Sequence, residues 1–249
     1  MAMQAIISDL HSNTAALTAV LDDIRSKGIT EILCLGDVIG YGPEPEEALD
    51  VAQGWKMCLQ GNHEEALLSD AHNFSIRARD AINWTRKKLD LDSDDPVKLA
   101  RWGFLEKLVP MQTVGDVMYV HGSPRAPTTE YIVPRDGQDQ RKMKDIFGRF
   151  DRLCFVGHSH IPGVYTEQGY SSPATLCDIY MCEPGRQALV NVGSVGQPRD
   201  GDPRACYVTF DGEAVVFRRI PYDIERTAQK IYAIPDLDRF LGDRLKEGK

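Results

Sequence analysis

Five short apolar runs of this chain end abruptly in side chains that can bind metal ions. They read AIISDLH, LCLGDV, MCLQGNHE, MYVHG and LCFVGHSH, and they contain five of the six histidines of the chain. A single histidine at a strand end is commonly a structural, hydrogen-bonded residue, but five of them at equivalent positions indicate a shared site. In open α/β sheets, ligands bind beyond the carboxyl ends of strands, so we expect these side chains to converge in one crevice.

The spacing of these runs predicts alternating strands and helices in the first half of the chain. QAIISD, EILCLGD and WKMCLQGN have the composition of buried strands. The helix expected after the first strand carries an apolar face with Leu17 and Val20, and it can begin at Ser12 or Asn13 and close at Gly28. PEPEEALDVAQG predicts a second helix. This β-α-β-α-β order predicts a parallel sheet with right-handed crossovers.

The second half has a different pattern. QTVGDVMYVHG and ACYVTFDGEAVVFRRI each place two β-rich arms around a Gly-Asp or Asp-Gly turn, which predicts hairpins and antiparallel pairing. LCFVGHSH and QALVNVGS are further strand candidates. Between the halves, residues 64–108 are helical and polar-rich, with Pro96 separating two helices. We expect one domain over residues 1–249, with residues 64–108 as a helical cap insertion.

Composition excludes several classes of function. The formal net charge of −8 does not favour binding of extended nucleic acid, which requires clustered lysine and arginine residues. There is no basic leader and no run of 18 apolar residues, so we expect no membrane association and a cytoplasmic location. The six cysteines form no CxxC pair, and several lie within apolar runs. We therefore expect reduced, mostly buried thiols rather than disulfides or a zinc–thiolate site.

The donor atoms of the five segments indicate a particular chemistry. Nitrogen and oxygen ligands without thiolate suit manganese, iron, zinc, cobalt or nickel. The number of ligands is enough for two divalent ions if one carboxylate bridges them. Two ions about 3.5–4 Å apart can hold the attacking and leaving oxygens of an in-line displacement at phosphorus. They would also supply the local positive charge that an acidic chain lacks.

The order D-x-H, G-D, G-N-H-E, H-G and G-H-S-H, running from Asp9 to His160, resembles the signature of the calcineurin-like metallophosphoesterase family. The β-rich tail from Gln187 to Pro221 resembles the small bacterial and archaeal phosphodiesterase branch of that family. The resemblance implies an α/β fold in which a central double β-sheet sandwich is flanked by helices in four layers, α/β/β/α.

The same resemblance implies a role for each motif residue. It assigns Asp9, His11 and His160 to the first metal, Asn62, His121 and His158 to the second, and Asp37 as the bridge. A metal-bridging hydroxide would attack phosphorus, because a bound cation lowers the pKa of water to about 7. His63 would stabilise the transition state and protonate the departing oxygen. Among the possible metals, manganese is favoured.

Weaker signals bear on the substrate. Gly40 and Tyr41 stand where related phosphoprotein phosphatases and dinucleoside tetraphosphatases carry an Asp-Arg pair, which favours small diesters over phosphoproteins. Arg125, Arg199 and Arg204 lie in loops, where each could be a solvated turn residue or could bind phosphate. Arg199 is the preferred substrate-binding arginine, together with Asn62. Tyr41 and Tyr131 could stack on a base, although packing is their commoner role.

Taken together, the sequence predicts a dinuclear-metal phosphoesterase that hydrolyses a small phosphodiester. The alternatives are a phosphomonoesterase, including one that acts on phosphoproteins, and a non-catalytic scaffold of the same fold. A nuclease of long DNA is disfavoured by the net charge of −8, while short oligonucleotides or cyclic nucleotides stay open as substrates. The expected partner is a small phosphate ester, with no extended nucleic acid and no membrane, and the oligomeric state is left open.

Overall fold

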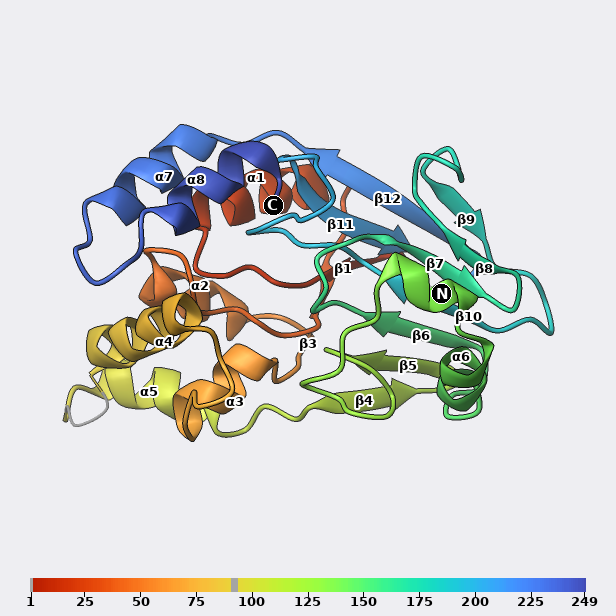
Figure 1. The fold of residues 1–249 in the computed structure, drawn as a ribbon, viewed down its shortest axis with the longest axis horizontal. Coiled ribbons are helices and arrows are strands. Elements are labelled where there is room, and N and C mark those ends of the chain that lie inside the picture. Colours follow the sequence, from red (N-terminus) through yellow and green to blue (C-terminus); the bar gives the residue numbers. More distant parts are fainter. Residues whose placement is uncertain (1, 91–93) are drawn as a thin grey trace.

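The computed structural model describes residues 2–90 and 94–249, and in this part of the chain two mixed six-stranded sheets pack together (Figure 1). The first sheet has the order β3-β2-β1-β11-β12-β9, and the second has the order β4-β5-β6-β10-β7-β8. The strands of the first sheet are β1 (Gln4–Ile7), β2 (Glu31–Cys34), β3 (Met57–Cys58), β9 (Ile179–Met181), β11 (Ala205–Phe210) and β12 (Ala214–Ile220). Those of the second are β4 (Met111–Val114), β5 (Val117–Val120), β6 (Leu153–Val156), β7 (Gly163–Thr166), β8 (Gly169–Ser171) and β10 (Ala188–Asn191).

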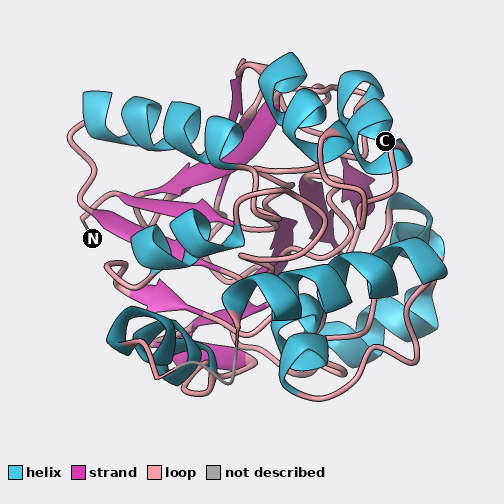
Figure 2. Cartoon of the chain, turned by 90° about the vertical axis from the view of Figure 1, so that its left-hand side faces the viewer, coloured by secondary structure: helices cyan, strands magenta, loops and turns pink. Residues whose placement is uncertain are grey.

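Helices lie on both sides of the two strand layers (Figure 2). They are α1 (Thr14–Ser26), α2 (Pro45–Ala52), α3 (Asn62–Leu68), α4 (Ile76–Leu89), α5 (Pro96–Leu105), the 3₁₀ helix η1 (Pro134–Gln138), α6 (Gln140–Phe147), α7 (Ile224–Tyr232) and α8 (Phe240–Glu247). α1 and α2 pack on the outer face of the first sheet, and α6 packs on the outer face of the second. The expected α/β/β/α sandwich is therefore confirmed.

The alternation of side chains along β1 shows how the layers are built. Ile6 points into the core between the two sheets, whereas Ala5 and Ile7 join the core under α1. Both faces of the strand are buried, which explains why its sequence is a continuous apolar run rather than an alternating one. On α1, Leu17 and Val20 contribute to the same outer core.

Several expectations from the sequence are met by the strand pairing. β1, β2 and β3 pair in parallel, and the two hairpins β4–β5 and β11–β12 are antiparallel. The sequence analysis did not assign β7, β8, β9 or α6, whereas most of α3 lies within the stretch 64–108 that was expected to be helical. α4 and α5 lie on either side of the break expected near Pro96. The role of residues 64–108 as a substrate-selecting cap stays a prediction.

Two further features concern the environment of the chain. All six cysteines are unpaired, as expected for reduced thiols. Within residues 2–90 and 94–249, no helix has both the length and the apolar composition needed to cross a bilayer.

The N-terminus of α1 is tied to distant parts of the chain by Asn13, which is 2% exposed. Its Oδ1 accepts hydrogen bonds from the Ala16 backbone N–H at 3.2 Å and from Thr227 Oγ1 at 2.8 Å. Its Nδ2 donates to the Gly196 carbonyl at 2.9 Å and to the Tyr222 hydroxyl at 3.2 Å. Asn13 is thus the cap of α1, and it also holds α7 and the loop that contains Gly196.

Replacement of Asn13 by alanine should destabilise the protein by about 2–4 kcal/mol, because a helix cap is lost and buried polar groups are left unpaired. Urea unfolding followed by circular dichroism measures this change. The matched control is Asn83→Ala on α4, where the side chain is exposed and the expected change is below about 0.5 kcal/mol. Equal effects of the two substitutions would contradict the role of Asn13.

Candidate metal centre

The five motif segments come together beyond the carboxyl ends of strands from both sheets. β1, β2 and β3 of the first sheet and β5 and β6 of the second all deliver their motif residues to this place. The expectation of one shared crevice is therefore met, although the crevice does not lie along the edge of a single sheet, because the motif strands belong to both sheets. The residues brought together are Asp9, His11, Asp37, Asn62, His63, His121, His158 and His160.

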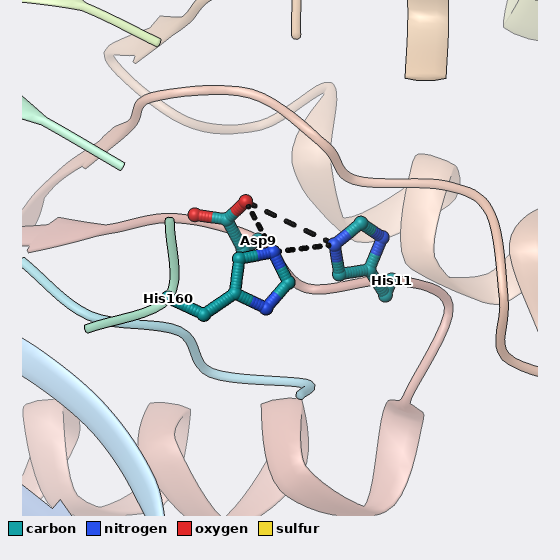
Figure 3. A group of neighbouring side chains, drawn as sticks. All are labelled: Asp9, His11 and His160. Atoms are coloured by element: carbon teal, nitrogen blue, oxygen red, sulfur yellow. Dashed lines mark hydrogen bonds and ion pairs between the residues drawn. The ribbon is translucent and has the colours of Figure 1, made fainter. Parts of the chain in front are cut away.

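Asp9, His11 and His160 form the first group (Figure 3). His160 Nε2 lies 3.1 Å from Asp9 Oδ1 and 3.2 Å from His11 Nε2. The distance between His11 Nε2 and Asp9 Oδ1 is 3.8 Å. All three residues are at most 1% exposed, and their donor atoms face one another.

The second group is built around His121. Its Nε2 lies 3.4 Å from Asp37 Oδ2, 3.1 Å from Asn62 Oδ1 and 3.1 Å from His158 Nδ1. Asp37 Oδ2 also lies 3.7 Å from His11 Nε2 of the first group. The carboxylate of Asp37 therefore stands between the two groups, where a bridging ligand would have to be.

The arrangement of these donor atoms fits bound metal ions. Asp9 Oδ1 is buried and has no hydrogen-bond partner among the described residues, although His160 Nε2 is close. Ligand nitrogens lie about 2.0–2.1 Å from a metal such as zinc, which separates neighbouring ligands of one ion by about 3.0–3.4 Å. The separations within both groups fall near this range. Asp9, His11 and His160 could hold one ion, and Asp37, His121 and His158 a second.

Backbone carbonyl groups orient three of the imidazole rings. The Nδ1 atoms of His11, His121 and His160 lie 3.1, 3.0 and 2.5 Å from the carbonyl oxygens of Ile39, Leu35 and Gln197, respectively. A carbonyl only accepts, so Nδ1 carries the proton in each ring. When such a ring is neutral, its Nε2 lone pair points into the site, as in typical metal-binding histidines.

The backbone is strained where it delivers the ligands. The φ angles are 54° at Asp9, 47° at His11, 53° at Asp37, 64° at His158 and 59° at His160. Left-handed backbone is uncommon outside glycine, although aspartate and histidine tolerate it better than most residues. Each such residue costs on the order of 1–3 kcal/mol, and clusters of them are typical of functional sites. The strained turns direct successive side chains of a short loop toward the same point.

The charges in the buried site are strongly coupled. Burial opposes the ionisation of Asp37, but the adjacent His121 and His63 hold the pKa of its carboxyl well below the usual range. Burial also disfavours the charged form of His121, and the carboxylate of Asp37 outweighs it and raises the pKa to about 10. For His158, burial and the nearby His121 lower the pKa to about 3. Burial thus dominates for His158 and lowers its pKa, whereas the carboxylate of Asp37 dominates for His121 and raises its pKa.

Glu64 is a buried residue of the site whose role the sequence analysis missed. Its Oε2 accepts hydrogen bonds from the Asp37 and Gly61 backbone N–H groups at 2.8 Å each, and its Oε1 accepts from the Ile39 N–H at 3.1 Å. Burial and the nearby Asp37 raise the pKa of Glu64 to about 7. This side chain fastens the start of α3 to the turn that carries Asp37. The signal in the sequence was the glutamate of the GNHE segment.

His63 also lies close to the ligand groups, since it forms with His11 and Asp37 a further group whose donor atoms could hold a metal ion. It is 2% exposed, and its Nε2 lies 4.0 Å from Asp37 Oδ2. Its ring packs against the rings of Tyr41 and Phe74, with centroid distances of 4.5 and 5.2 Å. Nδ1 has no hydrogen-bond partner among the residues that the structure describes. Burial, opposed by Asp37, lowers the pKa of this histidine to about 4.

The three candidate arginines have different surroundings. Arg125 is ion-paired with Glu130 and Asp145, and Arg204 is ion-paired with Asp202 at 2.6 Å. Arg199, by contrast, donates from Nη2 to Gln197 Oε1 at 2.8 Å. Its guanidinium carbon lies 5.9 Å from the centre of the Tyr41 ring.

Both candidate tyrosines pack against the site. Tyr131 stacks on His158 with a centroid distance of 3.8 Å, and the Tyr41 ring lies 4.7 Å from that of His11. Since Arg199 lies over Tyr41, it is the one of the three arginines that the fold brings next to the metal centre. Its role in binding substrate stays a prediction.

Metal-stripped protein should bind about two manganese ions per chain, because two donor groups share Asp37. Asp37→Ala should weaken binding on the order of 100-fold or more, since it removes a ligand common to both groups. Titration calorimetry and elemental analysis measure affinity and stoichiometry. The matched control is Asp70→Ala, because Asp70 also lies 4.0 Å from a histidine, His72, but is 64% exposed. Unchanged binding in Asp37→Ala would contradict the assignment.

Comparisons with known proteins find relatives and similar folds along the whole chain. An uncharacterized protein of Methanocaldococcus jannaschii is 38% identical over 258 residues, covering 99% of this chain and 98% of the relative. The crystal structure of a metallophosphoesterase from Sphaerobacter thermophilus has a TM-score of 0.84 at 34% identity, covering 100% of this chain and 99% of that one. A hypothetical protein from Pyrococcus horikoshii OT3 shares the fold, with a TM-score of 0.75 at 19% identity and the same coverage. The calcineurin-like phosphoesterase superfamily domain matches residues 3–214, and the chain belongs to this superfamily.

Proposed function

We propose that this protein hydrolyses a small phosphodiester with the help of two divalent metal ions. The observation that carries the proposal is the pair of buried nitrogen and oxygen donor groups joined by Asp37. Membership of a phosphoesterase superfamily indicates the class of bond that is cleaved. The proposal also includes manganese as the bound metal, a cytoplasmic location and a preference for diesters over monoesters.

Each part of the site has a distinct task in the proposed reaction. Divalent ions bound there would neutralise the phosphate charge and make a bound water acidic enough to ionise near neutral pH. Asp9, Asp37 and the histidines supply the ligands, and the amide of Asn62 would help to orient the phosphate. His63 is within reach of the same space, since its Nε2 lies 4.0 Å from Asp37 Oδ2. It would donate a proton to the departing oxygen, which removes the need for a good leaving group.

The surroundings of His63 favour small diesters over phosphoproteins. Phosphoprotein phosphatases that resemble this chain carry an Asp-Arg pair at the positions of Gly40 and Tyr41. The ring of Tyr41 packs directly on His63 and His11, so an aromatic ring rather than a charged Asp-Arg pair lies against these histidines. A scaffold role is disfavoured because the ligands and His63 are all present and lie together. The net charge of −8 disfavours an extended nucleic-acid substrate.

The test compares a bis-aryl phosphodiester with the matching aryl monoester. Metal-stripped protein should cleave the diester after addition of manganese, nickel, zinc or magnesium, and both Asp37→Asn and His63→Ala should lower the rate by about 100-fold or more. Asp70→Asn is the control that should keep the wild-type rate. Faster cleavage of the monoester would instead favour a phosphatase. Binding of metal without any cleavage would favour the scaffold alternative.

Gly40 is required for the position of His63. Its φ angle is +90°, and a Cβ at this residue would lie 2.0 Å from His63 Nδ1. Gly40→Ala should therefore displace His63 and lower kcat by about 100-fold, with metal stoichiometry unchanged. Gly28→Ala is the matched control, because Gly28 has a φ of +67° but nothing within 4 Å of the added Cβ. It should lose about 1 kcal/mol of stability and keep its activity.

A double mutant distinguishes displacement of His63 from general damage to the fold. In the His63→Ala background, Gly40→Ala should cause little further loss of kcat, since the clashing imidazole is gone. Steady-state assays on the diester give kcat for the wild type, for each single mutant and for the double mutant. A full further loss in the double mutant would show that Gly40 acts on something other than His63.

A further inference from the structure

One aromatic side chain at the metal centre differs from its neighbours in exposure. The rings of Tyr41 and Phe74 pack on His63 with centroid distances of 4.5 and 5.2 Å, and both residues are half-buried. The ring centre of Tyr131 lies 3.8 Å from that of His158, but Tyr131 is 48% exposed. Tyr131 therefore presents aromatic surface to solvent in direct contact with a candidate metal ligand.

The rings of Tyr131 and His158 are stacked rather than crossed. The angle between their planes is 22°, so one face of the tyrosine covers the histidine, which is only 3% exposed. The exposed surface of Tyr131 then belongs to its opposite face and its edges. A planar group could lie on this surface in the offset arrangement that aromatic rings prefer.

The loop that carries Tyr131 is fixed on both sides of this residue. On one side, Ile132 is buried in the core under α6. On the other, Glu130 is ion-paired with Arg125. The Tyr131 carbonyl also accepts a hydrogen bond from Lys142 Nζ at 2.9 Å. A ring that is held in this way needs little further ordering when a ligand packs on it.

The same loop orients the ring of His158. Its Nε2 lies 3.4 Å from the Thr129 carbonyl oxygen, and its Nδ1 lies 3.1 Å from His121 Nε2. Nδ1 therefore faces the donor group, and the flat side of the ring faces Tyr131. Tyr131 could thus serve only to hold His158, and a test of ligand binding has to separate these two roles.

The positions of two histidines indicate which arm of a diester meets the exposed tyrosine. His63 belongs to a donor group with His11 and Asp37, whereas His158 belongs to a different group that also contains Asp37. In the proposed function, His63 protonates the departing oxygen, so the leaving group lies at the His63 end of the site. The His158 end is then left for the arm that stays on phosphorus.

We propose that Tyr131 stacks on a planar aromatic ring of the substrate arm that is not released. The proposal rests on the function proposed above and narrows its substrates to phosphodiesters whose retained arm carries such a ring. The attraction between two stacked rings adds to the burial of apolar surface, so an aromatic arm should be favoured over a saturated arm of the same size. The expected preference is about 3- to 10-fold.

The test compares benzyl 4-nitrophenyl phosphate with cyclohexylmethyl 4-nitrophenyl phosphate, which share the leaving group and the primary alkyl ester. Manganese-loaded wild type should have about 3- to 10-fold higher kcat/KM for the benzyl diester. Tyr131→Leu should remove this preference, whereas Tyr131→Phe should retain it because the ring is kept. The matched control is Tyr180→Leu, because Tyr180 is half-buried but lies on the edge strand β9. It should keep the wild-type preference.

The outcomes separate stacking from a structural role of Tyr131. Equal kcat/KM of the wild type for the two diesters would overturn the stacking site while leaving the diesterase intact. An equal loss on both diesters in Tyr131→Leu, with the preference unchanged, would also overturn it and would show that the ring only holds His158.

A binding measurement keeps this proposal distinct from the proposed function. If the wild type cleaves neither diester, the diesterase proposal fails, and titration calorimetry on manganese-loaded protein then decides the stacking site. Benzyl phosphate should bind about 3- to 10-fold more tightly than cyclohexylmethyl phosphate, and Tyr131→Leu should abolish the difference. Equal affinities of the wild type for the two compounds would refute the stacking site.

Discussion

The carboxylate of Asp37 is the point on which the rest of the site depends. One oxygen faces His11, His63 and His121 at 3.7, 4.0 and 3.4 Å. The other accepts the His63 backbone N–H at 2.9 Å. A charge that is 1% exposed is costly unless cations and hydrogen bonds surround it. The fold provides these from both sheets, so the burial of one carboxylate requires the two sheets to meet at this place.

The same requirement explains the strained loops and the buried Glu64. Left-handed φ angles at five ligand positions are unfavourable in isolation. They persist because hydrogen bonds fix the turns from outside, as in the three bonds that Glu64 accepts from the backbone of Asp37, Ile39 and Gly61. The energy stored in the loops is therefore balanced by the sandwich that holds them. Surrounding residues commonly hold the ligand-bearing loops in this way where a site must be rigid before its ligand arrives.

The sequence was informative wherever a feature is local. Apolar runs that end in Asp9, Asp37 or His158 predict strands and strand-end ligands, because burial and donor chemistry are properties of neighbouring residues. It was less informative about which strands share a sheet. β5 and β6 carry motifs like those of β1 and β2, yet they lie in the opposite sheet, and the double sandwich was expected only from the family resemblance. β7, β8 and β9 were missed because their short, mixed sequences have no clear period.

The sequence could not predict which residues from distant loops and helices lie beside the site. Arg125, Arg199 and Arg204 have similar loop sequences. Only the fold shows that Arg125 and Arg204 are ion-paired, whereas Arg199 has no acidic partner within the described part of the chain. The docking of α8 beside Tyr41 is likewise a tertiary contact that no local pattern of the sequence predicts.

Charge provides the final link between the fold and its chemistry. The protein has a formal net charge of −8, so an anionic substrate is repelled at long range and must be attracted by local charge. The buried carboxylates cannot supply this attraction unless divalent ions overcompensate them, and the positive charge then depends on metal loading. Arg199 is different, because the charge of an arginine does not depend on metal content. Next to Tyr41 it adds local attraction for a small anionic ester, whereas a long nucleic acid would lie across the acidic remainder of the surface and be repelled.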